Sequence, residues 1–184
     1  MGNQLLPRSK ERINKVITFR KNPNERVLEL GGGSNPDPIS DCNVDVRMCF
    51  DIQGKPTVHF TTDFEKPFPI QDNEWDSVIS KYCLEHLSWT KVRSFLKEVF
   101  RITKTGGKVV FVTANTEAQM EWIKNHPDGW DNKGLFDAAS EVIFGSMDYP
   151  ENSHKLYLSP SLAMNLFQEA GFENILTQPH NDCG

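Results

Sequence analysis

A predicted strand that ends in three glycines occupies residues 27–36 of this chain, VLELGGGSNP. Four residues of strand-forming type run directly into the glycines, and Glu29 stands two positions before Gly31. Glycine adopts φ > 0 without a steric penalty and lets the backbone approach a ligand closely, so the turn predicts a binding site at a strand end. Phosphate is the usual ligand of such turns, because their amide N–H groups can surround an anion.

The composition predicts one ordinary globular domain. The chain has 184 residues, enough to bury a core, so residues 1–184 are interpreted as a single domain. A net charge of −5 argues against a nucleic-acid partner, because binding to a phosphate backbone depends on clustered Lys and Arg. No apolar run reaches the length of a membrane span, and residues 1–10 lack the apolar segment of a secretory signal. We therefore expect a cytoplasmic protein without membrane contact.

The cysteine pattern bears on metal binding. The chain has four cysteines, none of which form a CxxC pair, namely Cys42, Cys49, Cys83 and Cys183. Paired cysteines are the commonest sequence sign of a zinc site. The pattern predicts reduced thiols and no metal site.

Strand-like and helical segments alternate along the chain. Strands are predicted at residues 26–30, 42–46, 56–60, 75–80, 108–113 and 172–177. Helices are predicted at residues 9–20, within an N-terminal segment 1–24, and at 90–102, 117–124, 137–144 and 159–170. The helix at 90–102 has an apolar stripe that includes Phe100, and the glycines at 106 and 107 are expected to end it. Such alternation predicts an α/β fold with a parallel sheet covered on both faces.

The glycine turn fits a dinucleotide poorly. In a parallel sheet, ligands bind beyond the carboxyl ends of the strands where strand order reverses, and the turn after the first strand should be that point. A dinucleotide site needs G-x-G-x-x-G and an acidic residue about 20 positions later. Pro36 takes the place of the third glycine, and Asp45 follows Gly33 by only 12 positions. A ligand with a ribose but without a pyrophosphate fits better, which argues against a nicotinamide-dependent oxidoreductase.

Several motifs together resemble a known family. They are Glu29-x-Gly31-x-Gly33, the acid Asp45, Asp63-Phe64, FPIQDNEWDSVIS at 68–80, LEHL at 84–87, LKEVFRI at 96–102 and FQEAGF at 167–172. Their order and spacing resemble a class I methyltransferase that uses S-adenosylmethionine (SAM), and more narrowly the group called methyltransferase type 11. The resemblance covers roughly residues 25 to 177. It implies a Rossmann-like, doubly wound, mostly parallel sheet.

The resemblance also implies an incomplete sheet. The family's last strand is inserted between two others, and only residues 178–184 follow the sixth predicted strand. We therefore expect six strands with the final strand missing. The chain would then be truncated or would borrow a strand by forming a homodimer.

The implied cofactor residues surround the turn. The sulfonium and ammonium of SAM favour nearby oxygen atoms, so Glu29 with Gly31 and Gly33 is expected at the methionyl end. The family pattern implies that Asp45 accepts from the ribose hydroxyls, that Asp63 takes the adenine amino group with Phe64 against the ring, and that Lys81 lies near the methionyl end through its backbone carbonyl. The alternatives are a structural carboxylate for Glu29, a plain turn aspartate for Asp45 and a turn cap for Asp63.

Catalytic residues are harder to name. Methyl transfer is an in-line displacement that alignment and exclusion of water can accelerate without an acid or base. His86 could deprotonate an acceptor near pH 7, or the Glu85-His86 pair could only fix the loop. Tyr82 could line the path of the methyl group.

Residues 115–158 are too long for an ordinary connection and are interpreted as the substrate-side insertion. His154 and Tyr149 are its candidate acceptor-binding residues, with Trp130 and Tyr157 as further aromatic candidates. Alternatively, these aromatic side chains only pack on the sheet. The predicted function is methyl transfer to an unidentified small molecule, and the alternative is a non-catalytic SAM-binding module that stabilises a partner protein.

Overall fold

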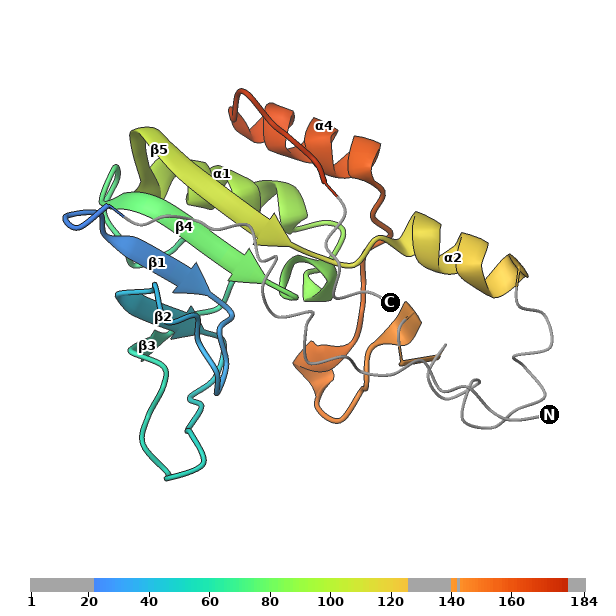
Figure 1. The fold of residues 1–184 in the computed structure, drawn as a ribbon, viewed down its shortest axis with the longest axis horizontal. Coiled ribbons are helices and arrows are strands. Elements are labelled where there is room, and N and C mark those ends of the chain that lie inside the picture. Colours follow the sequence, from blue (N-terminus) through green and yellow to red (C-terminus); the bar gives the residue numbers. More distant parts are fainter. Residues whose placement is uncertain (1–21, 126–139, 142, 179–184) are drawn as a thin grey trace.

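The computed structural model describes residues 22–125, 140–141 and 143–178, and a five-stranded parallel sheet forms its centre (Figure 1). The strands are β1 (Val27–Leu30), β2 (Cys42–Asp45), β3 (Phe60–Thr61), β4 (Trp75–Lys81) and β5 (Thr103–Val112). Their order across the sheet is β3-β2-β1-β4-β5, and every neighbouring pair is parallel. The predicted α/β, doubly wound fold is confirmed.

Strand order reverses beside β1. The chain proceeds from β1 outward to β2 and β3, and then returns to place β4 on the other side of β1. Ligands of open parallel sheets bind at such a reversal, beyond the carboxyl ends of the strands. The glycine turn follows β1 at this point, as the sequence predicts.

The core lies between the sheet and two helices. Leu28, Leu30 and Val78 share one face of the sheet and belong to one buried cluster with residues of α1 (Val92–Ile102). The helix α4 (Pro160–Ala170) packs beside α1 and adds Leu166 and Phe167 to the same cluster. Full burial of each such side chain stabilises the fold by roughly 1.5–3 kcal/mol. The sheet edge that carries the site therefore stands on a rigid support.

Most predicted helices are confirmed within two residues. The structure contains α1, α2 (Thr116–Asn125) and α4, together with the short 3₁₀ helices η2 (Leu84–His86) and η4 (Pro150–Asn152). Ser159 caps α4 by accepting from the Leu162 N–H, and Gly171 ends it at φ +112°. Residues 140, 141, 143 and 144 of the predicted helix at 137–144 are helical, whereas the rest of it and the helix at 9–20 lie outside the described residues. In the described part of the chain, no helix combines the length and apolar character that crossing a membrane requires.

Two strand boundaries were predicted wrongly. The third strand covers only Phe60–Thr61 instead of 56–60. Thr57 contacts the glycine turn instead, because its hydroxyl donates to the Gly33 carbonyl at 2.8 Å. The fifth strand begins at Thr103 instead of residue 108. Helix α1 ends there without a glycine, since the Thr103 hydroxyl donates to the Val99 carbonyl at 2.7 Å. The glycines expected to end the helix therefore lie inside β5.

The predicted sixth strand is wrong, and so is the six-stranded sheet. Residues 172–177 form no strand, and among the described residues β5 pairs with β4 alone. The Phe172 ring packs against Phe100 at 5.2 Å and Phe167 at 5.5 Å between centroids, and Asn174 has φ +54°, which interrupts an extended chain. Phe100, expected in the buried stripe of α1, is 46% exposed. Homodimer formation stays a prediction.

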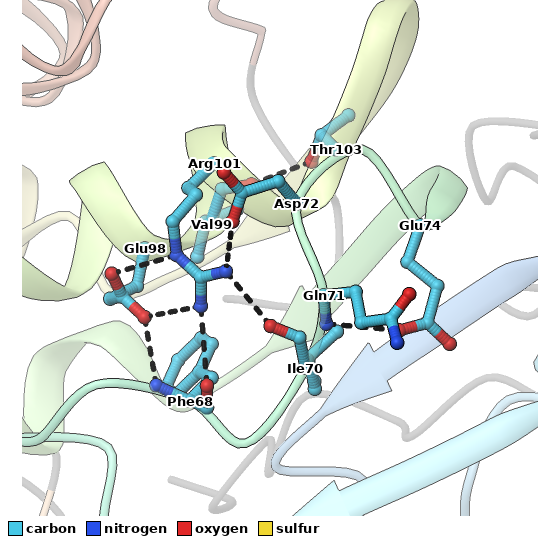
Figure 2. A network of polar contacts seen from close by, with 9 residues as sticks. All are labelled: Phe68, Ile70, Gln71, Asp72, Glu74, Glu98, Val99, Arg101 and Thr103. Atoms are coloured by element: carbon cyan, nitrogen blue, oxygen red, sulfur yellow. Dashed lines mark hydrogen bonds and ion pairs between the residues drawn. The ribbon is translucent and has the colours of Figure 1, made fainter.

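Arg101 ties the end of α1 to the loop that precedes β4 (Figure 2). Its guanidinium donates to both carboxylate oxygens of Glu98, at 3.1 and 2.7 Å, and to Asp72 at 2.6 Å. It also donates to the backbone carbonyls of Phe68 at 3.2 Å and Ile70 at 2.8 Å. The hydrogen bonds from Arg101 are the main reason why the pKa of Glu98 lies below its ordinary value. One side chain thus fixes the entry into β4, which lies between β1 and β5 in the sheet.

We expect Arg101→Ala to lower the free energy of unfolding by about 2–3 kcal/mol, because it leaves Glu98 and two carbonyls without a charged donor. Urea denaturation of the purified protein measures this loss. Arg93→Ala is the matched control, since Arg93 pairs with Glu169 at 2.7 Å but both side chains are more than half exposed. Arg93→Ala should lower the free energy of unfolding by less than about 1 kcal/mol. Equal losses in the two variants would contradict a structural role for the Arg101 network.

Candidate active site

Side chains of β2 hold the glycine turn that follows β1. The Gly32 N–H donates to Asn43 Oδ1 at 3.0 Å, and the Gly33 N–H donates to Asp45 Oδ2 at 3.0 Å. In return, Asn43 Nδ2 donates to the Gly33 carbonyl at 3.2 Å. Asn43 and Asp45 lie two positions apart on one strand, so both side chains point to the same side. The turn is therefore shaped before any ligand binds.

The three glycines serve different purposes. Gly31 has φ +79°, and a Cβ there would lie 2.8 Å from the Cβ of Cys83. A Cβ on Gly32 would lie 2.7 Å from Asn43 Oδ1, so tight packing excludes a side chain there too. Gly33 has φ +55°, and a Cβ there would have no atom within 4 Å. Open space thus lies beside Gly33, as a ligand that approaches the turn requires.

Glu29 is buried beneath the turn, with 2% of its surface exposed. Its carboxylate accepts from the Asp37 N–H at 2.7 Å, and burial raises its pKa above the ordinary value of glutamate. Asp37 in turn pairs with the ammonium of Lys81 at the end of β4. The positive charge of Lys81 is therefore matched by Asp37, and Glu29 serves at least to hold the loop after the glycines.

Asp45 ends β2 and is 8% exposed. Its Oδ1 accepts from the N–H groups of Val46 at 2.7 Å and Arg47 at 3.4 Å, and within the described part of the chain Oδ2 accepts from the Gly33 N–H alone. A carboxylate oxygen can accept two hydrogen bonds. Oδ2 therefore keeps the capacity to accept from a hydroxyl group placed in the open space beside Gly33.

Asp63 and Phe64 occupy different environments. The Asp63 carboxylate accepts from the Glu65 N–H at 2.9 Å and pairs with Lys66 at 3.1 Å; both bonds hold its pKa below the ordinary value. Asp63 therefore caps a turn, as its alternative interpretation states. Phe64 is 3% exposed and packs edge to face against Phe68 at 5.9 Å between centroids, so little of its ring surface remains for an adenine.

Two predicted histidines meet although they are far apart in the sequence. His86 ends η2, and the segment that follows η4 crosses it, with the Lys155 N–H donating to the Glu85 carbonyl at 2.8 Å. The rings of His86 and His154 lie 4.9 Å apart between centroids. Burial is the main reason why the pKa of His86 is lowered. The negative charge of Glu85 raises this pKa, whereas His154 lowers it further. The His86 ring is thus kept neutral near pH 7 and able to accept a proton.

Tyr149 lies at a different place from the histidine pair. Its ring stacks under the Arg47 guanidinium, 3.5 Å from the ring centroid, just beyond Asp45 at the end of β2. Burial raises the pKa of Tyr149. The structure therefore places Tyr149 beside the predicted ribose site. Tyr82 and Tyr157 are exposed, and Trp130 lies outside the described residues.

Sequence reasoning missed Asn43, Asp37 and Glu85 as site residues. Asn43 could have been found, because strand alternation places it on the same side as Asp45. Asp37 gave no signal, since its contacts with Glu29 and Lys81 depend on how the loop folds back.

Comparison with known proteins decides the family. A family model described as a methyltransferase domain matches residues 4–177. The chain belongs to this methyltransferase family. The resemblance to class I methyltransferases is confirmed, and the family supports SAM as the cofactor. The narrower type 11 group stays a prediction.

The sequences of two curated relatives match about half of this chain. The demethylmenaquinone methyltransferase of Renibacterium salmoninarum is 30% identical over 98 residues, which are 48% of this chain and 40% of that protein. The protein of the same name from Paenarthrobacter aurescens is 29% identical over 96 residues, 47% of this chain and 37% of that protein. The matched region thus spans about two fifths of the length of these curated relatives.

Solved structures support the fold. A SAM-dependent methyltransferase from Archaeoglobus fulgidus has a TM-score of 0.56 at 17% identity, over 82% of this chain and 62% of that one. A SAM-dependent methyltransferase from Thermotoga maritima, described as a possible histamine N-methyltransferase, has a TM-score of 0.54 at 18% identity, over 83% of this chain and 66% of that one. At these identities the likeness establishes the fold alone.

Gly31→Ala should destabilise the protein more than Gly54→Ala. Both glycines have φ near +78°, but a Cβ on Gly54 would meet no atom within 4 Å, whereas one on Gly31 would overlap Cys83. The control therefore measures the cost of the backbone conformation, about 1 kcal/mol, and the overlap at Gly31 should add about 1–3 kcal/mol. Urea denaturation of both variants gives the difference. Identical losses would show that Cys83 can move away freely.

Proposed function

We propose that this protein is a SAM-dependent methyltransferase that acts on a small-molecule acceptor. The observation that carries the proposal is the convergence of Glu29, the glycine turn and Asp45 at the carboxyl ends of the neighbouring strands β1 and β2. When bound, SAM supplies a methyl group on a sulfonium centre, which an acceptor atom can displace in line.

The cofactor would lie along the turn. Glu29 and the bare backbone from Gly31 to Gly33 would face the methionyl end, where oxygen atoms suit an ammonium and a sulfonium. The Oδ2 atom of Asp45 would accept from a ribose hydroxyl beside Gly33. Lys81 would contribute its backbone carbonyl, because its ammonium is already paired with Asp37.

Asp63 would receive the adenine amino group. Its carboxylate is 48% exposed, so it remains accessible while it caps its turn. Phe64 would support the site from below, because its ring is nearly covered and its edge lies 3.9 Å from the Cβ position of Gly31. This role replaces the ring-face contact expected from the sequence.

The acceptor would bind between the histidine pair and the turn. A neutral His86 can take a proton from an acceptor hydroxyl or amine, and His154 lies beside it. Tyr149, stacked on Arg47, would close the ribose end of the site against water. Demethylmenaquinone is the first acceptor to assay, because two relatives carry that name.

Turnover tests the proposal directly. The full chain is incubated with methyl-labelled SAM and either demethylmenaquinone or fractionated extract of the source cell, and S-adenosylhomocysteine and labelled products are measured. We expect labelled product in at least one reaction. His154→Ala should reduce turnover about 10²-fold while SAM affinity stays near wild type, as loss of a residue that positions the acceptor does. Tight SAM binding without turnover in any fraction would support the non-catalytic module instead.

Asp45→Asn should weaken SAM binding by about 1.5–3 kcal/mol, the range for a hydrogen bond to a charged group. The variant keeps an oxygen that can still accept from Gly33, so the turn should remain folded. Asp51→Asn is the matched control, because Asp51 Oδ1 also accepts backbone N–H bonds, from Gln53 and Lys55, in a loop away from β1. Calorimetry compares the two. Unchanged affinity in Asp45→Asn would remove Asp45 from the ribose site.

A further inference from the structure

Three side chains able to bind metals gather where the segment after η4 crosses η2. Glu85, His86 and His154 each offer one ligand atom, and these atoms lie within 4.8 Å of one another. Two ligands at about 2.1 Å from one ion can be at most about 4.2 Å apart. The three ligand atoms are therefore close to the spacing that one ion requires.

The carboxylate of Glu85 is buried without a lysine or arginine partner among the described residues. Glu85 is 2% exposed, and in the part of the chain that the structure describes it forms no ion pair with lysine or arginine. Its Oε2 accepts from the Thr113 hydroxyl at 2.8 Å, which orients the carboxylate. A buried carboxylate is costly unless it is paired or coordinates a metal. A cation bound beside Glu85 would compensate for the cost of burying its charge.

A backbone contact orients His86. A carbonyl oxygen can only accept, so the contact of 3.3 Å between His86 Nδ1 and the Ser153 carbonyl places the proton on Nδ1. Nε2 then keeps a lone pair that can bind an ion. Metal-binding histidines are commonly held in this way, by a hydrogen bond from the other ring nitrogen.

Backbone hydrogen bonds also place His154. Its N–H donates to the Phe144 carbonyl at 2.9 Å, and the next residue, Lys155, donates its N–H to the Glu85 carbonyl at 2.8 Å. These two bonds fix the segment on either side of the His154 ring. The third ligand is therefore held against the other two by the fold itself.

We propose that Glu85, His86 and His154 bind one divalent transition-metal ion, Zn²⁺ or an ion of similar ligand preference. Two imidazoles and a carboxylate suit such an ion and leave a further coordination position open. The sequence predicts no metal site because the cysteines form no pair, but this ligand set uses no cysteine. Its third member joins only through the fold.

The open position suggests which acceptors the enzyme takes. The histidine pair belongs to the acceptor side, so the ion would bind an oxygen atom of the acceptor and orient it. With the ion bound, Nε2 of His86 would be a ligand, so His86 would orient the acceptor through the ion instead of accepting its proton. This role rests on the proposed methyltransferase function, whereas metal binding itself does not. An acceptor that bears a hydroxyl or carbonyl oxygen next to the methylated atom fits best.

Calorimetric titration with ZnCl₂ tests the site on full-length, tag-free protein that has been treated with a chelator. We expect one ion per chain, and His86→Ala, His154→Ala and Glu85→Gln should each weaken binding by about 100-fold. His59→Gln is the matched control and should bind Zn²⁺ as wild type, because His59 is an exposed histidine outside the cluster. The glutamine oxygen can still accept the Asn43 N–H that His59 Nδ1 accepts at 3.0 Å. Visible absorption of bound Co²⁺ gives a second readout.

Thr113→Val keeps all three ligands and removes the hydroxyl that orients Glu85, so it should weaken Zn²⁺ about tenfold, as loss of an orienting partner does. Thr113→Val therefore still tests the metal site if one of the ligand variants fails to fold. A wild-type protein that binds no stoichiometric Zn²⁺, or ligand variants that bind as well as wild type, would overturn the proposal. SAM affinity is measured in parallel. SAM binding without Zn²⁺ binding would overturn only the proposed metal site, and Zn²⁺ binding without SAM binding would overturn only the proposed methyltransferase function.

Discussion

The hydrogen bonds from Gly32 and Gly33 to the side chains of β2 are the constraint on which the site depends. They exist because β1 and β2 pair in parallel with Glu29 opposite Asn43. A shift of one residue in this register would turn Asn43 and Asp45 to the other face of the sheet. The turn would then lose its partners, and Asp45 would leave the open space beside Gly33. Strand pairing, set by buried leucine and valine side chains, therefore decides the chemistry at the strand ends.

Burial of Glu29 shows what the site costs the fold. Its pKa is raised, so the folded chain holds a proton on Glu29 more tightly than the unfolded chain does, and its charged form opposes folding as the pH rises. Lys81 stands close enough to offset part of this cost but pairs with Asp37 instead. A carboxylate kept against its solvation preference at a strand end is typical of functional sites. We expect a well-packed apolar residue at position 29 to stabilise the chain and to remove the cofactor contact proposed for Glu29.

Local patterns predicted the parts of the fold that depend on near neighbours. The strand β1, the glycine turn, the Ser159 cap and the Gly171 end of α4 each follow from a few adjacent residues, and each is present. The start of β5 and the fate of residues 172–177 depend on distant partners. Thr103 leaves α1 by bonding back to Val99, and Phe172 joins the aromatic cluster of Phe100 and Phe167. No short stretch of sequence shows which of these contacts with distant residues will form.

The same distinction divides the site into two halves. The proposed cofactor half comes from β1 and β2, whose residues lie close in the sequence, so motifs alone predict it. The proposed acceptor half forms only because the segment 153–155 crosses η2, where the Lys155 N–H donates to the Glu85 carbonyl and the His154 ring lies beside His86. If this proposed site binds the acceptor, changes in the residues after η4 would alter the acceptor without affecting β1 or β2. A methyltransferase domain of this kind is expected to keep its cofactor while its acceptor changes, and the insertion is where that difference must be sought.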